Sequence, residues 1–207
     1  FAPGQPLQVA TVWLKAYCAC YCTHAYIDAL RPFAARRTEI ADVHLKITPH
    51  FNVVVGTANA NAYTPRNIEH VQFSLPIQAA FALLGLGNGY PVHRDYLAGK
   101  VDMAPVIALA RGIRITEEPA LEKSHPGKFV ADVTVAFQDG SSQHVFVADP
   151  IGTDTNPMPE HVQDAKFMEL TEGVLGAGRA RALLAALRAM DPAMKAADLT
   201  ALCAAAQ

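Results

Sequence analysis

The chain has 207 residues, of which 51% are hydrophobic and 17% are charged, and its formal net charge is −2. This composition supports a hydrophobic core and excludes a chain that is disordered throughout. It provides no basic stripe for nucleic acid, no polybasic run for an anionic membrane surface and no apolar run long enough for a spanning helix. We therefore expect a globular protein with no nucleic-acid or membrane partner.

The N-terminal stretch and the cysteine content bear on location. The start, "FAPGQPLQVATVWLK", has no basic leader and no small-residue cleavage site, so no secretory signal is expected. Four cysteines in such a chain are predicted to be reduced thiols. These features predict a cytoplasmic protein, and the missing initiator methionine leaves a processed subunit, a truncated chain or a fragment open.

The first half of the chain predicts strands, one helix and a long loop. "ATVWLKAY" (10–17) is β-branched and aromatic enough for a strand, and "THAYIDALRPFAARR" (23–37) has helical spacing. Thr23 is the expected cap of that helix, and Pro32 should kink or end it. "ADVHLKI" (41–47) alternates as a half-buried strand does, and residues 48–70 predict a long loop with "NVVVG" as a candidate interruption.

The middle of the chain carries the strongest secondary-structure signals. "QFSLPIQAAFALLGLGNG" (72–89) predicts a helix with Ser74 as its cap, Pro76 in its first turn and Gly85 or Gly87 at its end. A shorter helix at 102–111 should lead into a strand at 112–116. "KFVADVTVAFQDGSSQHVFVAD" (128–149) predicts a β-hairpin that turns at Asp139-Gly140.

The last part of the chain predicts helices. Pro159 should open one, and two helices rich in Ala and Leu (179–190 and 194–206) follow, separated by Asp191-Pro192. Strands and helices do not alternate as βαβ units. We therefore predict an α+β fold, an antiparallel sheet with helices packed on one face, as a single domain over residues 1–207.

Cys18, Cys20 and Cys22 alternate and allow three interpretations. If the segment is extended, all three point to one side. One-residue spacing does not suit a tetrahedral zinc site, and no second Cys/His cluster follows. A nucleophilic cysteine with His24 as its base has only proximity in sequence to support it. Burial as small apolar side chains is the leading interpretation, and no metal ligand is predicted.

Lys15 lies in an otherwise apolar stretch, "TVWLKAY". Burying its ammonium without a partner would cost several kcal/mol, on the order of a lost ionic hydrogen bond or more. It is therefore either an edge residue with its charge in solvent or a pocket lysine that holds a substrate carboxylate. His24 is either a satisfied, partly buried imidazole or a donor to the same anion.

Read together, four segments resemble the C-terminal domain of the MmgE/PrpD family. They are "LKAYCACYCTHAYIDAL" (14–30), "VQFSLPIQAAFALL" (71–84), "KFVADVTVAFQDGSSQHVFV" (128–147) and "GTDTNPMPEHVQDAKFMEL" (152–170). The first is similar to the family's Lys-x-Tyr-Pro-x-Cys stretch followed by a histidine. This chain departs from that pattern at Cys18, where relatives usually have proline, and at Tyr21, where they often have arginine.

The resemblance implies a fold and a chemistry. Members of the family, among them 2-methylcitrate dehydratase, cis-aconitate decarboxylase and iminodisuccinate epimerase, act on small polycarboxylates. A helical large domain carries their acid/base residues, and a smaller α+β lid domain closes over it. By resemblance, Lys15 is the pocket lysine that binds a carboxylate and stabilises developing charge, whereas His24, Gln72 and Ser74 are substrate-binding candidates. The large domain has no counterpart in this sequence.

The sequence thus predicts the lid domain or small subunit of an MmgE/PrpD-type enzyme, which dehydrates, decarboxylates or epimerises a small di- or tricarboxylate. Its expected partners are the helical large domain or subunit and the polycarboxylate, in a homo- or hetero-oligomer, with no metal or organic cofactor. A stand-alone, non-catalytic binding or structural module of the same fold is the alternative. A cysteine-centred enzyme or zinc protein is a third reading.

Overall fold

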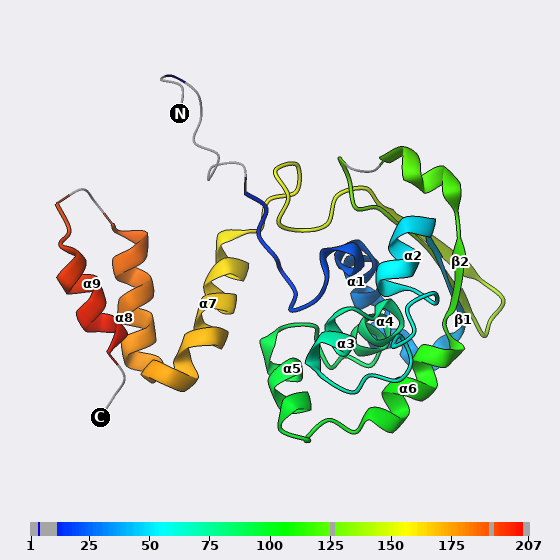
Figure 1. The fold of residues 1–207 in the computed structure, drawn as a ribbon, viewed down its shortest axis with the longest axis horizontal. Helices are drawn as coiled ribbons and strands as arrows, with labels where there is room; N and C mark the ends of the chain where they lie inside the picture. Colours follow the sequence, from blue (N-terminus) through cyan, green and yellow to red (C-terminus); the bar gives the residue numbers. More distant parts are fainter. Residues whose placement is uncertain (1–3, 5–11, 125–126, 191–192, 205–207) are drawn as a thin grey trace. The chain divides into compact units, whose positions relative to one another are not determined.

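The computed structural model describes residues 4, 12–124, 127–190 and 193–204. These residues divide into two compact units, the first up to Pro157 and the second from Met158. The first unit contains a four-stranded sheet and several short helices, and the second unit is helical (Figure 1).

Four strands form one sheet in the order β2-β1-β3-β4. Their bounds are β1 (Ile40–Ile47), β2 (Arg114–Glu117), β3 (Ala131–Phe137) and β4 (Ser142–Val147). The hairpin of β3 and β4 is antiparallel and turns at Gly140, whose positive φ of 84° suits glycine, so this prediction is confirmed. β3 also pairs antiparallel with β1, but β2 runs parallel to β1. A parallel pair is accessible here because a long helical crossover separates the two strands.

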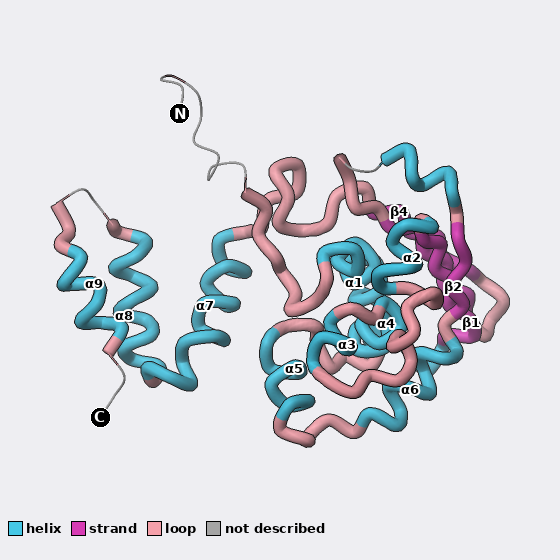
Figure 2. Tube along the Cα trace, viewed as in Figure 1, coloured by secondary structure: helices cyan, strands magenta, loops and turns pink. Residues whose placement is uncertain are grey.

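Helices cover one face of this sheet, as the sequence predicts (Figure 2). Val43, Leu45 and Ile47 of β1 alternate with half-exposed residues and are buried beside Val133 and Val135 of β3. The same core contains Tyr26, Leu30, Leu75 and Leu83. Apolar alternation on two neighbouring strands therefore fixes which face the helices bury.

The first unit has six α-helices and three 3-10 segments among its described residues. The α-helices are α1 (His24–Leu30), α2 (Pro49–Val55), α3 (Ile68–Gln72), α4 (Leu75–Leu83), α5 (Tyr90–Leu97) and α6 (Met103–Gly112); the 3-10 segments are Tyr21–Thr23, Arg31–Glu39 and Pro119–Ser124. The predicted caps hold for α4, where Ser74 accepts the N–H of Ile77, and the helix at 102–111 is confirmed as α6, which Asp102 caps.

Two predictions in this unit are wrong, and a third is confirmed only in part. Residues 12–17 are not a strand (Ala10 and Thr11 lie outside the described residues). The predicted loop over 48–70 is interrupted at "NVVV", as the sequence allowed, but the interruption is the helix α2, which Thr48 caps and Pro49 opens, and α3 begins at Ile68 before the predicted end of the loop. Thr23 precedes α1 without capping it, because its hydroxyl donates to the carbonyl of Cys20 instead. α1 itself ends at Leu30 and continues as the 3-10 segment that contains Pro32.

The second unit has three helices among its described residues: α7 (Glu160–Leu175), α8 (Ala177–Arg188) and α9 (Ala196–Cys203). Pro159 occupies the N-cap position of α7, as predicted. Leu175, Ala180 and Leu183 form a small core, and Arg188 pairs with Asp164 between α8 and α7. Asp191 and Pro192, predicted to separate the last two helices, lie outside the described residues.

Candidate functional site

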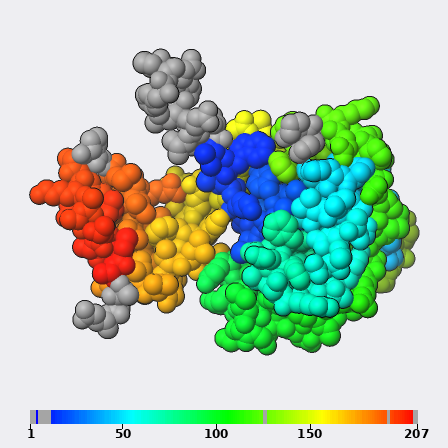
Figure 3. Space-filling model, in the orientation of Figure 1, coloured from blue at the N-terminus to red at the C-terminus, as the bar shows by residue number. Residues whose placement is uncertain are grey.

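Residues 12–20, which we name the Lys15 segment, run along the surface of the first unit without regular structure (Figure 3). Three backbone N–H groups hold the segment: Leu14 donates to the carbonyl of Gly152, Cys18 to that of Asn88 and Cys20 to that of Gln72, each over 2.9 Å. Because these acceptors belong to three separate parts of the chain, no strand ladder forms.

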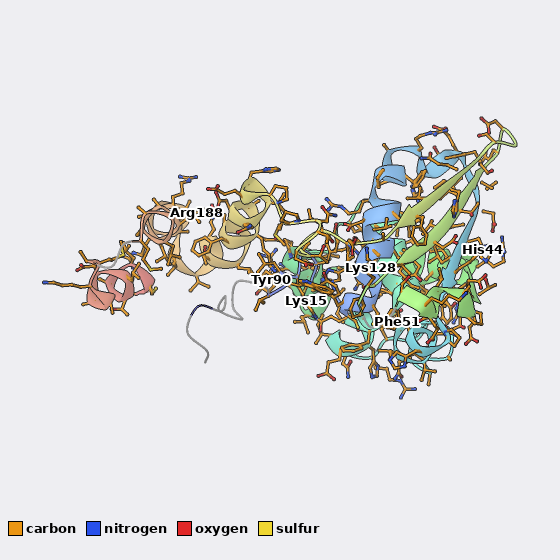
Figure 4. The ribbon with its side chains drawn as sticks, turned by 90° about the horizontal axis from the view of Figure 1, so that it is seen from above. Lys15, His44, Phe51, Tyr90, Lys128 and Arg188 are labelled. Carbon is orange, nitrogen blue, oxygen red and sulfur yellow. The ribbon has the colours of Figure 1, made fainter. Side chains whose placement is uncertain are left out.

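Lys15 is exposed, and its ammonium nitrogen Nζ donates to the carbonyl of Ala19 over 3.1 Å. This contact curls the side chain back over its own segment. In Figure 4 the residue lies on the side of the first unit away from His44, which belongs to the helix-free face of the sheet. Lys15 therefore presents a positive charge at the surface beside irregular backbone.

His24, the first residue of α1, is fully buried. Its Nε2 lies 3.3 Å from the carbonyl oxygen of Ala19, and since a carbonyl can only accept, Nε2 carries the hydrogen. Its ring stacks on Tyr21 at 4.6 Å between centroids and tilts against Tyr17 at 5.1 Å. Lys15 and His24 thus share one acceptor, and the Ala19 carbonyl joins the exposed cation to the buried imidazole.

Gln72 joins this arrangement and Ser74 does not. The side-chain amide of Gln72 donates to Sγ of Cys18 over 3.1 Å, and the backbone carbonyl of Gln72 accepts the N–H of Cys20. Ser74 is fully buried, donates to the carbonyl of Ala62 over 2.6 Å and accepts from Ile77. The structure thus brings Lys15, His24 and Gln72 around residues 18–20, whereas the hydroxyl of Ser74 serves the fold.

A half-buried carboxylate that the sequence analysis did not single out, Asp28, anchors the segment. Tyr17 donates its hydroxyl hydrogen to Asp28 and accepts from Arg31 over 3.1 Å, and the N–H of Ile151 donates to Asp28 over 2.8 Å. Burial raises the pKa of Asp28, although these donors act against the increase. The i,i+3 spacing of Asp28 and Arg31 on one predicted helix was the available signal.

The ring of Tyr21 packs between Trp13 of the Lys15 segment and Phe129, which packs against the main core. Its ring stacks on Trp13 and His24 and meets Phe129 edge-on, at 5.5, 4.6 and 5.0 Å between centroids. Its hydroxyl is buried and has no hydrogen-bond partner among the described residues. Burial, helped by the negative charge of Asp28, raises its pKa to about 12, so the phenol is a neutral donor.

The cysteines of this region occupy different environments. The segment bends at residues 16–19 and enters a 3-10 turn at Tyr21–Thr23, so the extended arrangement that would align all three thiols is wrong. Cys18, Cys20 and Cys22 are each half-buried, and Cys20 and Cys22 pack against the main core. The described residues contain no group of three or more His, Cys, Asp or Glu side chains placed to hold a metal ion.

Three surface hollows of the first unit lie away from Lys15. The largest, about 400 Å³, lies among the end of α4, α5 and the start of α6, and includes Val92, Asp95 and Lys100. A second of about 270 Å³ lies between α1 and β4, and a third of about 210 Å³ is beside α6. None of the three is lined by Lys15, so they give the segment no enclosed pocket.

The fold defines the class of protein as a small α+β domain with a mixed, mostly antiparallel sheet. Its sequence matches the family model of the MmgE/PrpD C-terminal domain over residues 17–191, and the chain belongs to that family. The match spans both compact units and includes His24, Gln72 and Ser74, while Lys15 precedes its first residue by two positions. A comparison with curated proteins gives no match. Among the described residues, no helix is both long and apolar enough to cross a membrane.

Proposed function

We propose that this chain is the lid domain or small subunit of an MmgE/PrpD-type enzyme that acts on a small di- or tricarboxylate. Family membership supports the general assignment. The observation that carries the site is the exposed ammonium of Lys15, held at the Ala19 carbonyl beside His24. A positioned cation at the surface can bind the carboxylate group of a substrate that a second domain or subunit holds.

The chemistry proposed for Lys15 is electrostatic. Removing a proton next to a carboxylate, as in dehydration or epimerisation, builds negative charge on the substrate, and so does the loss of CO2 in decarboxylation. A positioned ammonium stabilises this charge more in the transition state than in the ground state. Gln72 is proposed as a further polar contact of the substrate. His24, being fully buried, would act by holding the Ala19 carbonyl.

The general base is proposed to come from the partner, a helical large domain or subunit in a homo- or hetero-oligomer. Dehydration, decarboxylation and epimerisation all remain open for this pair, and no metal or organic cofactor is proposed. The departures at Cys18, within the Lys15 segment, and at Tyr21, directly after it, are expected to select the substrate among polycarboxylates.

Reconstitution tests the proposal. The chain is mixed with a helical large domain of the family, and turnover of citrate-like acids is measured for the wild type, Lys15→Ala and the control Lys123→Ala, another exposed lysine of the first unit. Loss of a charge that stabilises the transition state should lower kcat about 100-fold or more in Lys15→Ala alone. Unchanged turnover would remove the role of Lys15. Micromolar binding of a dicarboxylate by the isolated chain, measured by calorimetry, would instead favour a stand-alone binding module.

A further inference from the structure

Three polar side chains, those of Gln78 in α4, Asn88 and His93 in α5, are fully buried and in contact with one another. Their surroundings are apolar. The ring of Phe81 meets the His93 ring edge-on, at 6.0 Å between centroids, and both Phe81 and Val71 belong to one apolar cluster. Burying polar groups costs free energy unless they are hydrogen-bonded, so this arrangement depends on the partners of these side chains.

Every N–H of the three side chains donates a hydrogen bond. Nδ1 of His93 donates to the carbonyl of Gly89 over 2.7 Å, so Nε2 accepts, and its donor is the amide of Gln78 at 3.1 Å. The other hydrogen of that amide goes to the carbonyl of Val71 over 3.0 Å. The amide of Asn88 donates to the side-chain oxygen and to the backbone carbonyl of Gln78, each over 2.9 Å. Only a neutral His93 fits these contacts, and burial lowers its pKa accordingly.

Asn88 connects this network to the Lys15 segment. Its backbone carbonyl accepts the N–H of Cys18 over 2.9 Å. Asn88 lies in an irregular stretch between Gly87, which has a φ of 77°, and Gly89, so the local chain alone restricts its position little. The two hydrogen bonds from its side chain to Gln78 supply this restriction and thereby fix the acceptor of Cys18.

The other end of the network holds the second anchor of the segment. The amide of Gln78 donates to the carbonyl of Val71 in α3. The next residue, Gln72, accepts the N–H of Cys20 with its backbone carbonyl over 2.9 Å. One side chain, that of Gln78, is therefore bonded to one anchor and to the direct neighbour of the other.

We propose that Gln78 is a positioning residue for the ammonium of Lys15. Ala19 lies between the two anchored residues of the segment, and Nζ of Lys15 donates to its carbonyl over 3.1 Å. The position of this carbonyl, and with it that of the ammonium, thus depends on the contacts that Gln78 makes with both sides. An apolar side chain at position 78 would fill the same volume but would fix no direction. The catalytic consequence rests on the proposed function, whereas the arrangement of the segment can be measured without partner or substrate.

Amide hydrogen exchange of the full chain, followed by NMR, tests the arrangement. In Gln78→Leu the amides of Cys18 and Cys20 should exchange about tenfold or more faster relative to the amides of β1. Val106→Ala is the matched control, because Val106 is fully buried in the same apolar cluster and its side chain makes no hydrogen bond, so this ratio should stay unchanged. Equal acceleration of the segment and of β1 in Gln78→Leu would overturn the proposal.

A second variant tests the direction of the contacts and does not require Gln78→Leu to fold. Asn88→Ala keeps the backbone carbonyl but removes both hydrogen bonds to Gln78, whereas the bond from Gln78 to α3 remains. The amide of Cys18 should therefore exchange faster, and that of Cys20 should change less. The same change at both amides and in β1 would contradict a separate anchor at Asn88.

Turnover by the chain mixed with a helical large domain tests the role in catalysis. Gln78→Leu should lower kcat about tenfold, because a displaced ammonium stabilises the transition state less. In the Lys15→Ala background the same substitution should lower kcat less than about twofold. Equal losses in both backgrounds would overturn the positioning role, since a purely structural effect does not depend on Lys15. Unchanged kcat in Lys15→Ala alone would overturn the proposed function and the catalytic consequence, while the exchange rates still decide whether Gln78 holds the segment.

Discussion

The sheet core and the Lys15 segment are held by different forces. In the core, Leu45, Leu30 and Val133 are fully buried, and their neighbours on other elements are apolar. In the segment, Leu14 and Lys15 are exposed, and single hydrogen bonds to two loops and to the end of α3 hold the backbone. The difference teaches that stability and the candidate chemistry reside in separate places, so each can be changed with limited effect on the other.

The largest effect is expected in the core. Leu45→Ala removes a fully buried side chain between the helices and the sheet and leaves a cavity, so the free energy of unfolding should fall by about 3 kcal/mol. Urea unfolding followed by far-UV circular dichroism measures the change. Val53→Ala in α2, whose side chain is 65% exposed, is the control and should change stability by less than about 0.5 kcal/mol. Similar losses of unfolding free energy for Leu45→Ala and Val53→Ala would contradict the claim that the buried core provides the stability.

Gly152→Ala should act on the segment instead. Gly152 has a φ of 102°, and a Cβ there would overlap the carbonyl oxygen of Leu14, the residue whose N–H Gly152 accepts. Strain and the lost contact should together cost about 2 kcal/mol. Gly140→Ala is the matched control, because its φ of 84° is also positive but its Cβ would meet open space, so it should cost less, about 1 kcal/mol.

The fluorescence of Trp13, the single tryptophan of the chain, shows which part of the structure this strain destabilises. Because Trp13 belongs to the Lys15 segment, its fluorescence should change at a lower urea concentration in Gly152→Ala than in the wild type. The far-UV signal should shift less. Coincident shifts of both signals would mean that the segment unfolds only together with the core.

The same contrast explains what the sequence could predict. β1, the hairpin and α4 carry their own signals, namely alternation, an Asp-Gly turn and a Ser cap, and all three are confirmed. "ATVWLKAY" has the composition of a strand, but strands need a partner edge, and the acceptors of residues 14, 18 and 20 lie in three different places. Such long-range partners leave no local pattern. The candidate interruption of the loop at "NVVVG" was not predicted to be the helix α2, because its three valines favour strands, although Thr48 and Pro49 form a helix-start signal.

The candidate site residues also divide into those with a local sequence signal and those whose partners lie far away in the chain. Lys15 and His24 were predicted from a motif, and their common acceptor at Ala19 brings them together. The anchoring role of Asp28 depends on Tyr17 and on Ile151, which is far away in the chain. No sequence pattern connects these positions.

Asp28→Asn should have an intermediate effect. Tyr17 and Ile151 donate to different oxygens of Asp28, and asparagine replaces one of these oxygens with an NH2 group, so one donor loses its acceptor and the free energy of unfolding should fall by about 1 kcal/mol at neutral pH. Burial raises the pKa of Asp28 above its ordinary value of 3.8, so just above that pH the folded state binds more protons than the unfolded state. Stability of the wild type relative to Asp28→Asn should therefore decrease as pH rises through this window. Urea unfolding at pH 4 and pH 7 measures the difference, and the opposite slope would contradict the assignment.

The smallest effect is expected for Trp13→Phe. Phenylalanine keeps a ring against Tyr21 and Phe129 but loses the indole N–H, which donates to Asp154 over 3.1 Å at an exposed position. Exposed hydrogen bonds contribute little, so the loss should be about 0.5 kcal/mol by far-UV unfolding. A double-mutant cycle with Asp154→Ala, which removes the acceptor, isolates the contact and should give a coupling energy of similar size. A coupling above about 1.5 kcal/mol would mean that polar anchors hold the Lys15 segment as firmly as single methylene groups hold the core. The segment could then not be altered independently of the sheet.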